Sequence, residues 1–433
     1  MKRITLSSVI ASLLVVVIGG VVLHAPLTVF VGAHIPEIAT PIKAWKELVI
    51  LIASVLILFE IWRQKQWRRL VHPVVALSIA YIVLHLVMAV WWRLPIASMI
   101  AGLMVDLRFV AIFVVVYLFL SLYPAYKKWL LWAFGIGGII VIGFACLQIV
   151  LPRDILASIG YGPETIQPYL TVDSNDAYVR INSTLRGPNP LGVYAMVSLV
   201  IGAAYTATNW RQLQGTRRLL LLIAGGCSAL ALWASYSRSA ALALLVAFGV
   251  IVVATKKWRL AIEQWIMIAG IVLAGVVSGL FLLQDTSFMH NVILHDDPTS
   301  GPTVTSNSAH ADSLKEGLQR MIAQPFGAGV GSTGSASLRG DAPIIIENQY
   351  LFIAHEAGWL GVLLYLVLFS VVLELLWRRR RSYLALGVFA AGIGIAFIGL
   401  MQPVFVDDTI SILWWAFAAL VIATVPQKRK GRI

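Results

Sequence analysis

The chain has 433 residues, of which 59% are hydrophobic and 12% are charged, and its mean hydropathy is +0.86. Soluble domains average about 45–50% apolar and about 25% charged residues, so this composition excludes a soluble enzyme and predicts a polytopic membrane protein. High apolar content and only two cysteines also exclude a disordered chain and a disulfide scaffold. The formal net charge of +13 raises the question of which side of the bilayer carries the basic residues.

A helix that crosses the hydrocarbon core needs about 20 mostly apolar residues. Such runs predict an all-α protein with about 12 transmembrane helices, forming one integral membrane domain over residues 1–433. The predicted spans are about 7–30, 46–62, 70–92, 100–122, 129–151, 191–209, 219–235, 239–255, 262–283, 349–376, 383–402 and 409–425. Only Tyr236-Ser237-Arg238 separates the seventh span from the eighth, which predicts a tight hairpin.

Two thirds of the 33 lysines and arginines fall in alternate loops that share a side with Met1. The positive-inside rule therefore predicts that both termini are cytoplasmic. The two long loops, about 152–190 and 284–348, are then extracytoplasmic, and we expect the active face and a partly helical loop region there. No P-loop sequence occurs, so we expect neither a nucleotide nor a nucleic acid as a partner.

The first long loop ends in two arginines and an asparagine on a stiff turn at the start of the sixth span. These are Arg180, Arg186 and Asn189, and Pro188 and Pro190 break the helix around them. A guanidinium is well shaped for a phosphate, so one interpretation is phosphate recognition. The other is anchoring to lipid headgroups, because basic residues are common at the membrane surface.

Other ionisable residues lie at the predicted outer ends of spans. Arg238 lies in the tight hairpin, where it either faces a cavity or partner or extends to the interface. Asp106 and Arg108 lie near the outer end of the fourth span, and they could form an ion pair with each other or take part in binding.

The second long loop contains a predicted amphipathic helix around residues 308–322. Its apolar stripe is Leu314, Leu318, Met321 and Ile322. Glu316 and Arg320 are spaced for an i,i+4 ion pair on the polar side. His310 lies one turn before the stripe; packing is its ordinary role, but the pKa of a histidine also suits proton transfer.

A glycine-rich segment, residues 324–334, follows this helix. It contains a literal GxGxxG pattern, but no strand precedes it, which argues against a dinucleotide site. It is either a flexible loop or a nest of backbone amides, with Gly329 and Gly331, that binds a phosphate.

Glu347, Asn348 and Tyr350 mark the start of the tenth span. A glutamate suits the helix dipole there and an asparagine can cap the helix, yet a carboxylate in a partly dry cleft can also act as a base. Two other acidic groups, residues 295–297 and Asp407-Asp408, have metal-ligand residue types without a metal-specific spacing. We interpret both as solvated loops and expect no metal site.

Five short motifs, in this order, resemble the O-antigen ligase and O-antigen polymerase family of bacterial membrane glycosyltransferases. They are Arg186-Gly-Pro-Asn189, Ser237-Arg238-Ser239, Pro325-Phe-Gly327-Ala-Gly329-Val-Gly331, Asn348-Gln-Tyr350-Leu351 and Glu356-Ala-Gly358-Trp-Leu-Gly361. The resemblance covers the chain from about Arg180 to Gly361, whereas the first 150 residues match in hydropathy alone. It implies a GT-C-like fold in the bacterial inner membrane.

The resemblance also implies an activity. Such enzymes transfer a glycan from undecaprenyl pyrophosphate to an acceptor hydroxyl, on lipid A–core in the ligases or on another lipid-linked repeat in the polymerases. The implied partners are this donor, a glycan or glycolipid acceptor and membrane lipid, with no cofactor and no metal. The ligases carry a histidine directly before the asparagine that corresponds to Asn348, whereas this chain has Glu347.

The predicted mechanism is a direct, inverting displacement. Arg186 and Arg238 are the first candidates for stabilising the leaving phosphate, and Arg180 and Arg320 are the second candidates. Either Glu347 or His310 is the base, and Asn348 and Tyr350 orient the base or the sugar. The alternative is a transporter or flippase of a lipid-linked anionic glycan, in which the same arginines line a path.

Overall fold

The computed structural model describes residues 5–172, 175–255, 286, 306–340 and 343–426, and these residues are almost entirely helical. In this part of the chain, eight helices are long and apolar enough to cross a membrane. The predicted all-α polytopic membrane fold is therefore confirmed. The number of twelve spans stays a prediction, because the ninth, about 262–283, lies outside the described residues.

The other predicted spans each coincide with a helix. The first is an almost continuous helix of α1 (Leu6–Gly20), a 3-10 turn (Val21–Leu23) and α2 (His24–His34). The next are α4 (Trp45–Arg63), α5 (Pro73–Trp92), α6 (Ile96–Leu122), α7 (Lys127–Val150), α8 (Pro188–Asn209), α9 (Gly215–Ala234) and α10 (Arg238–Thr255). The last are α14 (Gln349–Trp377), α15 (Tyr383–Ile398) and α16 (Asp408–Thr424).

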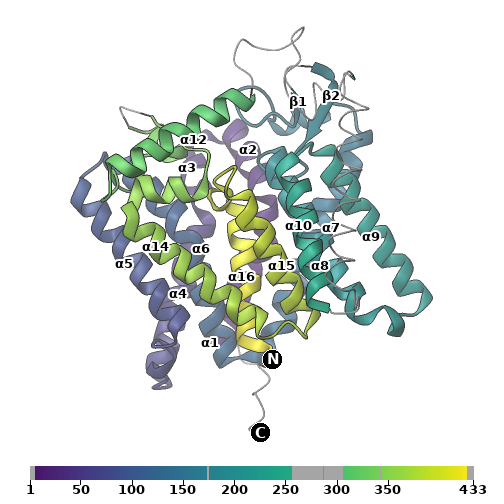
Figure 1. Cartoon of the computed structure of the whole chain (residues 1–433), viewed down its shortest axis with the longest axis horizontal. Helices are drawn as coiled ribbons and strands as arrows, with labels where there is room; N and C mark the ends of the chain where they lie inside the picture. The colour runs from purple at the N-terminus through teal and green to yellow at the C-terminus, as the bar shows by residue number, and fades with distance from the viewer. Residues whose placement is uncertain (1–4, 173–174, 256–285, 287–305, 341–342, 427–433) are drawn as a thin grey trace, which may run out of the picture.

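These helices form a bundle with α16 at its centre (Figure 1). Almost every side chain of α16 is buried, as expected for a helix that is apolar on all sides. Trp414 and Trp415 contact the aromatic rings of Phe109 on α6 and Phe369 on α14, with centroids 4.9–5.9 Å apart. The Trp414 indole donates a hydrogen bond to the Val388 carbonyl on α15, so its polar group is satisfied within the core.

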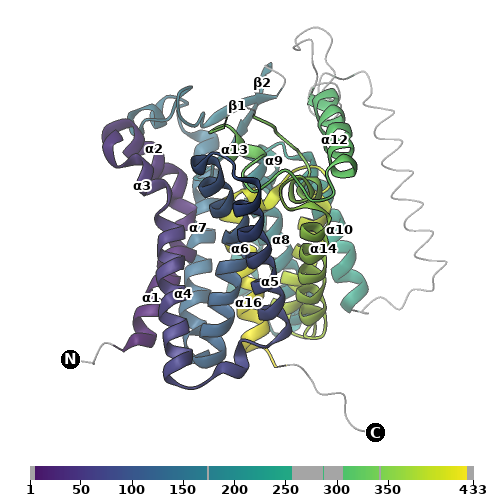
Figure 2. The same cartoon turned by 90° about the vertical axis from the view of Figure 1, so that its left-hand side faces the viewer.

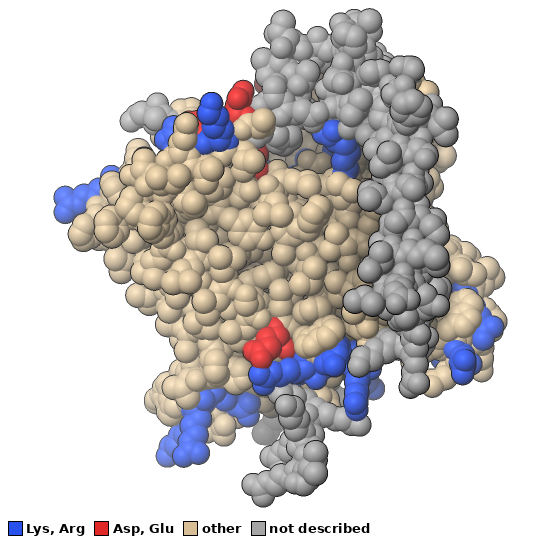
Figure 3. Space-filling view, viewed as in Figure 1, with Lys and Arg blue, Asp and Glu red and all other residues tan. Residues whose placement is uncertain are grey.

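The outside of the bundle is apolar. Leu51, Val90 and Ile139 are among many large hydrophobic side chains that are 60–74% exposed. An apolar surface of this extent is expected where a protein faces lipid. In the space-filling view, Lys and Arg side chains gather around one end, and the band between the two ends consists mostly of uncharged residues (Figure 3).

The two ends of the bundle differ in structure (Figures 1 and 2). We call one the terminal end, because α1 begins and α16 ends there. The other is the hairpin end, which holds the antiparallel strands β1 (Tyr169–Val172) and β2 (Asn175–Ile181), paired with Tyr169 opposite Ile181. The hairpin end also holds the short helices α3 (Ala39–Lys43) and α13 (Gly334–Ser337) and the amphipathic α12 (Ser306–Ala323).

The tenth predicted span is not one uninterrupted helix, which corrects the prediction for residues 349–376. Gly358 has φ +67° and breaks α14 after its first nine residues. The break leaves carbonyl groups without their helical partners, and the glycine-rich segment fills it. The amides of Ala328 and Gly329 donate to the carbonyls of His355 and Glu356, and the Trp359 amide donates to the Pro325 carbonyl.

Candidate functional site

Arg180 joins three separate segments at the hairpin end. It lies on β2, its Nε donates to the Ser235 carbonyl in the turn between α9 and α10, and its Nη2 lies 2.7 Å from Asn189 Oδ1 at the start of α8. The same turn packs against α8, where a Cβ on Gly192 would overlap Ser237. The starts of α8 and α10, which carry Asn189 and Arg238, are therefore held side by side.

Arg186 and Arg238 differ in their surroundings. Arg186 is an exposed residue just before α8, and among the described residues no hydrogen bond or ion pair of its guanidinium is found. Its charge nevertheless acts on Asp407, Asp408 and His24. Arg238 is the half-buried first residue of α10, and it has an interaction partner of its own.

A buried ion cluster lies close to Arg186. Asp408, which is 1% exposed at the start of α16, lies 3.1 Å from both Lys46 Nζ on α4 and His24 Nε2 on α2. Trp45 Nε1 donates to His24 Nδ1, so the ring proton is on Nε2 and faces Asp408. Charges removed from water in this way require partners of the opposite sign, and each charge of this cluster has one.

The cluster extends to α6 through a second ion pair. Lys46 Nζ lies 3.4 Å from Glu47 Oε2, and Arg108 Nε donates to Glu47 Oε1 at 2.7 Å. The predicted pairing of Asp106 with Arg108 is therefore wrong, because residues two apart on a helix point in different directions. Asp106 instead faces the His85 ring, with Oδ2 and Nε2 4.0 Å apart.

Asp407 and Asp408 are likewise not the solvated loop that we predicted. Asp407 caps α16 by accepting a hydrogen bond from the Ile410 amide, and Asp408 is buried. Burial raises the pKa of Asp407 to about 6, and the neighbouring Asp408 carboxylate adds to this shift. An aspartate pair at the start of an apolar run, with His24 and Lys46 inside or beside other runs, was the available sequence signal.

A small hollow of about 110 Å³ separates α8 from the connection between α15 and α16. Its lining residues are Pro190, Val193, Gln402, Pro403, Val404, Asp407 and Ile410. Asp407 thus borders the hollow on one side, and the first turn of α8, just after Arg186, borders it on the other.

The start of α14 contacts the same α15–α16 connection. Asn348 caps α14 by accepting hydrogen bonds from the Tyr350 and Leu351 amides, and its Nδ2 donates to the Leu400 carbonyl. Gln349 Oε1 accepts from the Phe405 amide, and the Tyr350 hydroxyl donates to the Ala396 carbonyl. These contacts give Asn348 and Tyr350 a structural role; their role in binding stays a prediction.

Glu347 is half-buried and directly precedes this cap. The Glu347 amide donates to Ser313 Oγ on α12, and Glu347 has at least one further interaction. The α15–α16 connection therefore contacts Asn348 through Leu400, Gln349 through Phe405, and α8 through the hollow. This places the candidate base and Arg186 on two sides of one connection.

Helix α12 packs on α14 through Gly317, at which a Cβ would lie 3.1 Å from Leu351 Cδ1. The predicted ion pair between Glu316 and Arg320 is present at 2.6 Å. Leu314, Leu318 and Ile322 of the predicted apolar stripe are 47–65% exposed. His310 lies on α12 by position, and its side chain is outside the described part of the structure.

Gly329 and Gly331 have packing roles that the sequence did not reveal. Both have positive φ, and a Cβ on Gly331 would overlap the Ser98 carbonyl of α6. The Gly329 amide is bound to α14, while the amides of Gly331 and Thr333 donate to the buried Glu356 carboxylate. These amides bind the protein itself, so the predicted phosphate nest receives no support from the geometry.

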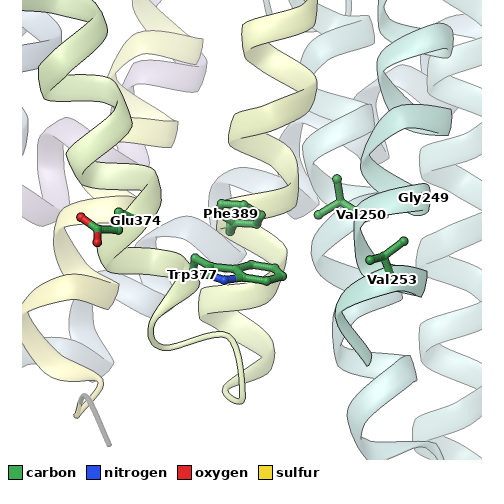
Figure 4. Close-up of a pocket in the computed structure, with 6 residues that line it drawn as sticks. All are labelled: Gly249, Val250, Val253, Glu374, Trp377 and Phe389. Carbon is green, nitrogen blue, oxygen red and sulfur yellow. The ribbon is translucent and has the colours of Figure 1, made fainter. Parts of the chain in front are cut away.

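A separate hollow of about 560 Å³ lies toward the terminal end, between α10, α14 and α15 (Figure 4). Val250, Val253, Trp377 and Phe389 line it, and its one carboxylate, Glu374, is paired with Arg378. Such a lining suits an acyl chain and not a phosphate. Within the described ranges, no group of three or more His, Cys, Asp or Glu side chains could hold a metal ion.

Comparison with known families gives a match in the second half of the chain. Residues 219–366, about a third of the chain, match the family model described as O-antigen ligase. This confirms the predicted resemblance, which at the level of the family supports a membrane enzyme of the glycosyltransferase type. The matched region contains Arg238, Arg320 and Glu347, whereas Arg180 and Arg186 precede it. No curated protein matches the chain.

Proposed function

We propose, from the match of residues 219–366 to the O-antigen ligase family, that the chain transfers a glycan from an undecaprenyl-pyrophosphate-linked donor to an acceptor hydroxyl. One observation supports the location best: the hydrogen bonds of Arg180 hold the starts of α8 and α10 together. Arg186, just before α8, and Arg238, the first residue of α10, therefore belong to two segments that are joined at one end of the bundle.

The leaving group explains the need for fixed cations. When the bond between the anomeric carbon and the phosphate oxygen breaks, negative charge develops on the pyrophosphate. Arg186 is exposed and its guanidinium is available to this group, while Arg238 lies at a helix N-terminus, which also favours anions. Arg180 is committed to Asn189 and Ser235, so we assign it the positioning of these two segments.

Direct displacement requires a base for the acceptor. The acceptor oxygen attacks the anomeric carbon, its proton passes to Glu347 or His310, and undecaprenyl pyrophosphate leaves with the bonding electron pair. The anomeric centre is inverted, and the step needs no metal. Glu347 is the stronger candidate, because it is half-buried beside the α15–α16 connection that also borders Arg186's segment.

The basic residues support an orientation. The terminal end has the basic loops and the hairpin end has the candidate site, so the positive-inside rule places the termini in the cytoplasm of a bacterial inner membrane. Donor and acceptor then meet at the outer face. The acceptor is lipid A–core in a ligase or a second lipid-linked repeat in a polymerase.

Purified protein in proteoliposomes tests the proposal. Wild type is incubated with undecaprenyl-pyrophosphate-linked oligosaccharide, with and without lipid A–core, and the products are separated by size. We expect a new, larger glycan, and about 10²–10³-fold slower transfer by Arg186→Ala and by Arg238→Ala. Arg217→Ala removes an exposed arginine of α9 as the matched control and should transfer normally.

The base is tested in the same assay. Glu347→Gln should slow transfer about 10²-fold or more while the thermal unfolding curve is retained. A loss of that size with His310→Ala, and not with Glu347→Gln, would move the assignment to His310. Movement of labelled donor across the bilayer with no glycan product would contradict transfer and favour the transporter.

A further inference from the structure

Three basic side chains come together at the terminal end, away from the proposed transfer site. Arg69 ends the 3-10 turn Trp67–Arg69, His72 is the N-cap of α5, and Arg379 follows α14. Arg379 acts electrostatically on His72 and Tyr117, and Arg69 acts on Tyr117. The sequence alone presented the two arginines as topology signals, because each belongs to a basic loop.

The three residues are held in place by different contacts. Arg379 Nε donates to the Val425 carbonyl at the end of α16, and its Nη1 donates to the Leu375 carbonyl, both at 2.8 Å. The His72 ring packs on the Tyr117 ring with centroids 5.1 Å apart. The position of the guanidinium is therefore fixed by two helix ends, unlike that of a flexible surface arginine.

The cluster contains polar nitrogen atoms that the protein leaves without a partner among the described residues. Arg69 Nε and His72 Nδ1 are buried from solvent and have no hydrogen-bond partner in the part of the chain that the structure describes. Such groups cost free energy unless a partner from outside the chain satisfies them. Burial also lowers the pKa of Arg379, which shows that its charge is partly removed from water.

No carboxylate balances these charges. Among the described residues, the ion pairs at this end join Arg63 to Glu60 and Arg378 to Glu374, and neither includes a member of the cluster. Trp67 and Val71, beside Arg69 and His72, are 50% and 74% exposed, as expected for residues at the boundary with lipid. An anion at the bilayer surface is the partner that fits both observations.

We propose that Arg69, His72 and Arg379 form a binding site for a phosphate group, which an anionic phospholipid headgroup supplies. The guanidinium fork matches phosphate oxygens, and the partial burial strengthens each hydrogen bond. Anionic headgroups are abundant beside basic loops, and the exposed Trp67 and Val71 offer a surface for the acyl chains. This inference is independent of the proposed glycan transfer.

Thermal unfolding of the full chain in neutral detergent tests this site. The additives are dioleoyl phosphatidylglycerol, dioleoyl phosphatidylcholine and inorganic phosphate. We expect phosphatidylglycerol at saturation to raise the Tm of the wild type by about 5 °C. The Arg69→Ala/Arg379→Ala variant should lose this shift. The Arg68→Ala/Arg381→Ala variant removes two exposed arginines from the same loops, and it should retain the shift.

The outcomes separate the two sources of phosphate. A shift with phosphatidylglycerol and none with inorganic phosphate supports the headgroup, whereas equal shifts with both identify a free-phosphate site and overturn the lipid assignment. Equal shifts in the two double variants overturn the site itself. If the alanine variant does not fold, Arg69→Gln/Arg379→Gln keeps a nitrogen donor at the bond position of Nε, which in Arg379 donates to Val425, while removing both charges, and native mass spectrometry counts the bound lipid.

Discussion

The two ends of the bundle contain the same types of charged residue in opposite arrangements. At the hairpin end, Lys46 and Arg108 are buried, and each is paired with a carboxylate of a different helix. At the terminal end, Arg69 and Arg379 are half-buried and face no carboxylate among the described residues. Internal pairing fixes geometry next to the proposed transfer site, whereas cations without a carboxylate partner among the described residues leave room for an anion from outside.

The largest expected effect comes from breaking the internal pairing. Lys46→Met leaves Asp408 buried without its close cationic partner, so it should lower the free energy of unfolding by about 3–5 kcal/mol. Arg381→Ala, an exposed change at the terminal end, should stay within about 0.5 kcal/mol. Chemical denaturation in detergent measures both, and similar losses would remove the contrast between the ends.

A smaller effect is expected where the glycine-rich segment fills the break in α14. Gly358→Ala forces a side chain to φ +67° and brings its Cβ into overlap with the Pro325 carbonyl, so we expect a loss of about 2 kcal/mol or more. Gly226→Ala on α9 is the matched control, because a Cβ there meets nothing within 4 Å. That variant should be neutral or slightly more stable. Equal stability of the two variants would show that the break is not needed.

The smallest effect concerns pH. The pKa of Asp407 is raised to about 6 from an ordinary value of 3.8, so its protonated form is favoured in the folded state. The stabilisation is present below the ordinary pKa and is lost as the pH rises through about 6. Between pH 4 and pH 6, the unfolding free energy of Asp407→Asn should therefore fall by about 1–2 kcal/mol less than that of the wild type. Parallel curves for wild type and variant would contradict a raised pKa of Asp407 in the folded state.

Local sequence patterns predicted most of the fold and part of the site. Each described span was predictable, because a membrane helix must be apolar over its own length. The i,i+4 pair of Glu316 and Arg320 was predictable for the same local reason. The ion cluster of His24, Lys46 and Asp408 was not, because its members lie on three helices far apart in the sequence.

The glycine-rich segment shows the same limit. Its sequence allowed a phosphate nest or a flexible loop, and the structure instead uses its amides to satisfy the carbonyls exposed by Gly358, about 30 residues further along. Asp106 likewise faces His85 and Glu356 on other helices, while Arg108 pairs with Glu47 and not with Asp106 on its own helix. In each case, the packing of the helices determines which group is the partner, and that packing depends on all the helices together.

The composition and the alternation of basic loops determined by themselves that this chain is a multi-pass membrane protein with the positive charge concentrated on one side. Those properties follow from the solvent, which acts on every segment independently. The tertiary structure alone decided which cations are neutralised inside the protein and which face outward. A buried charge is stable only beside an opposite charge, and the contacts between helices determine where such a partner lies.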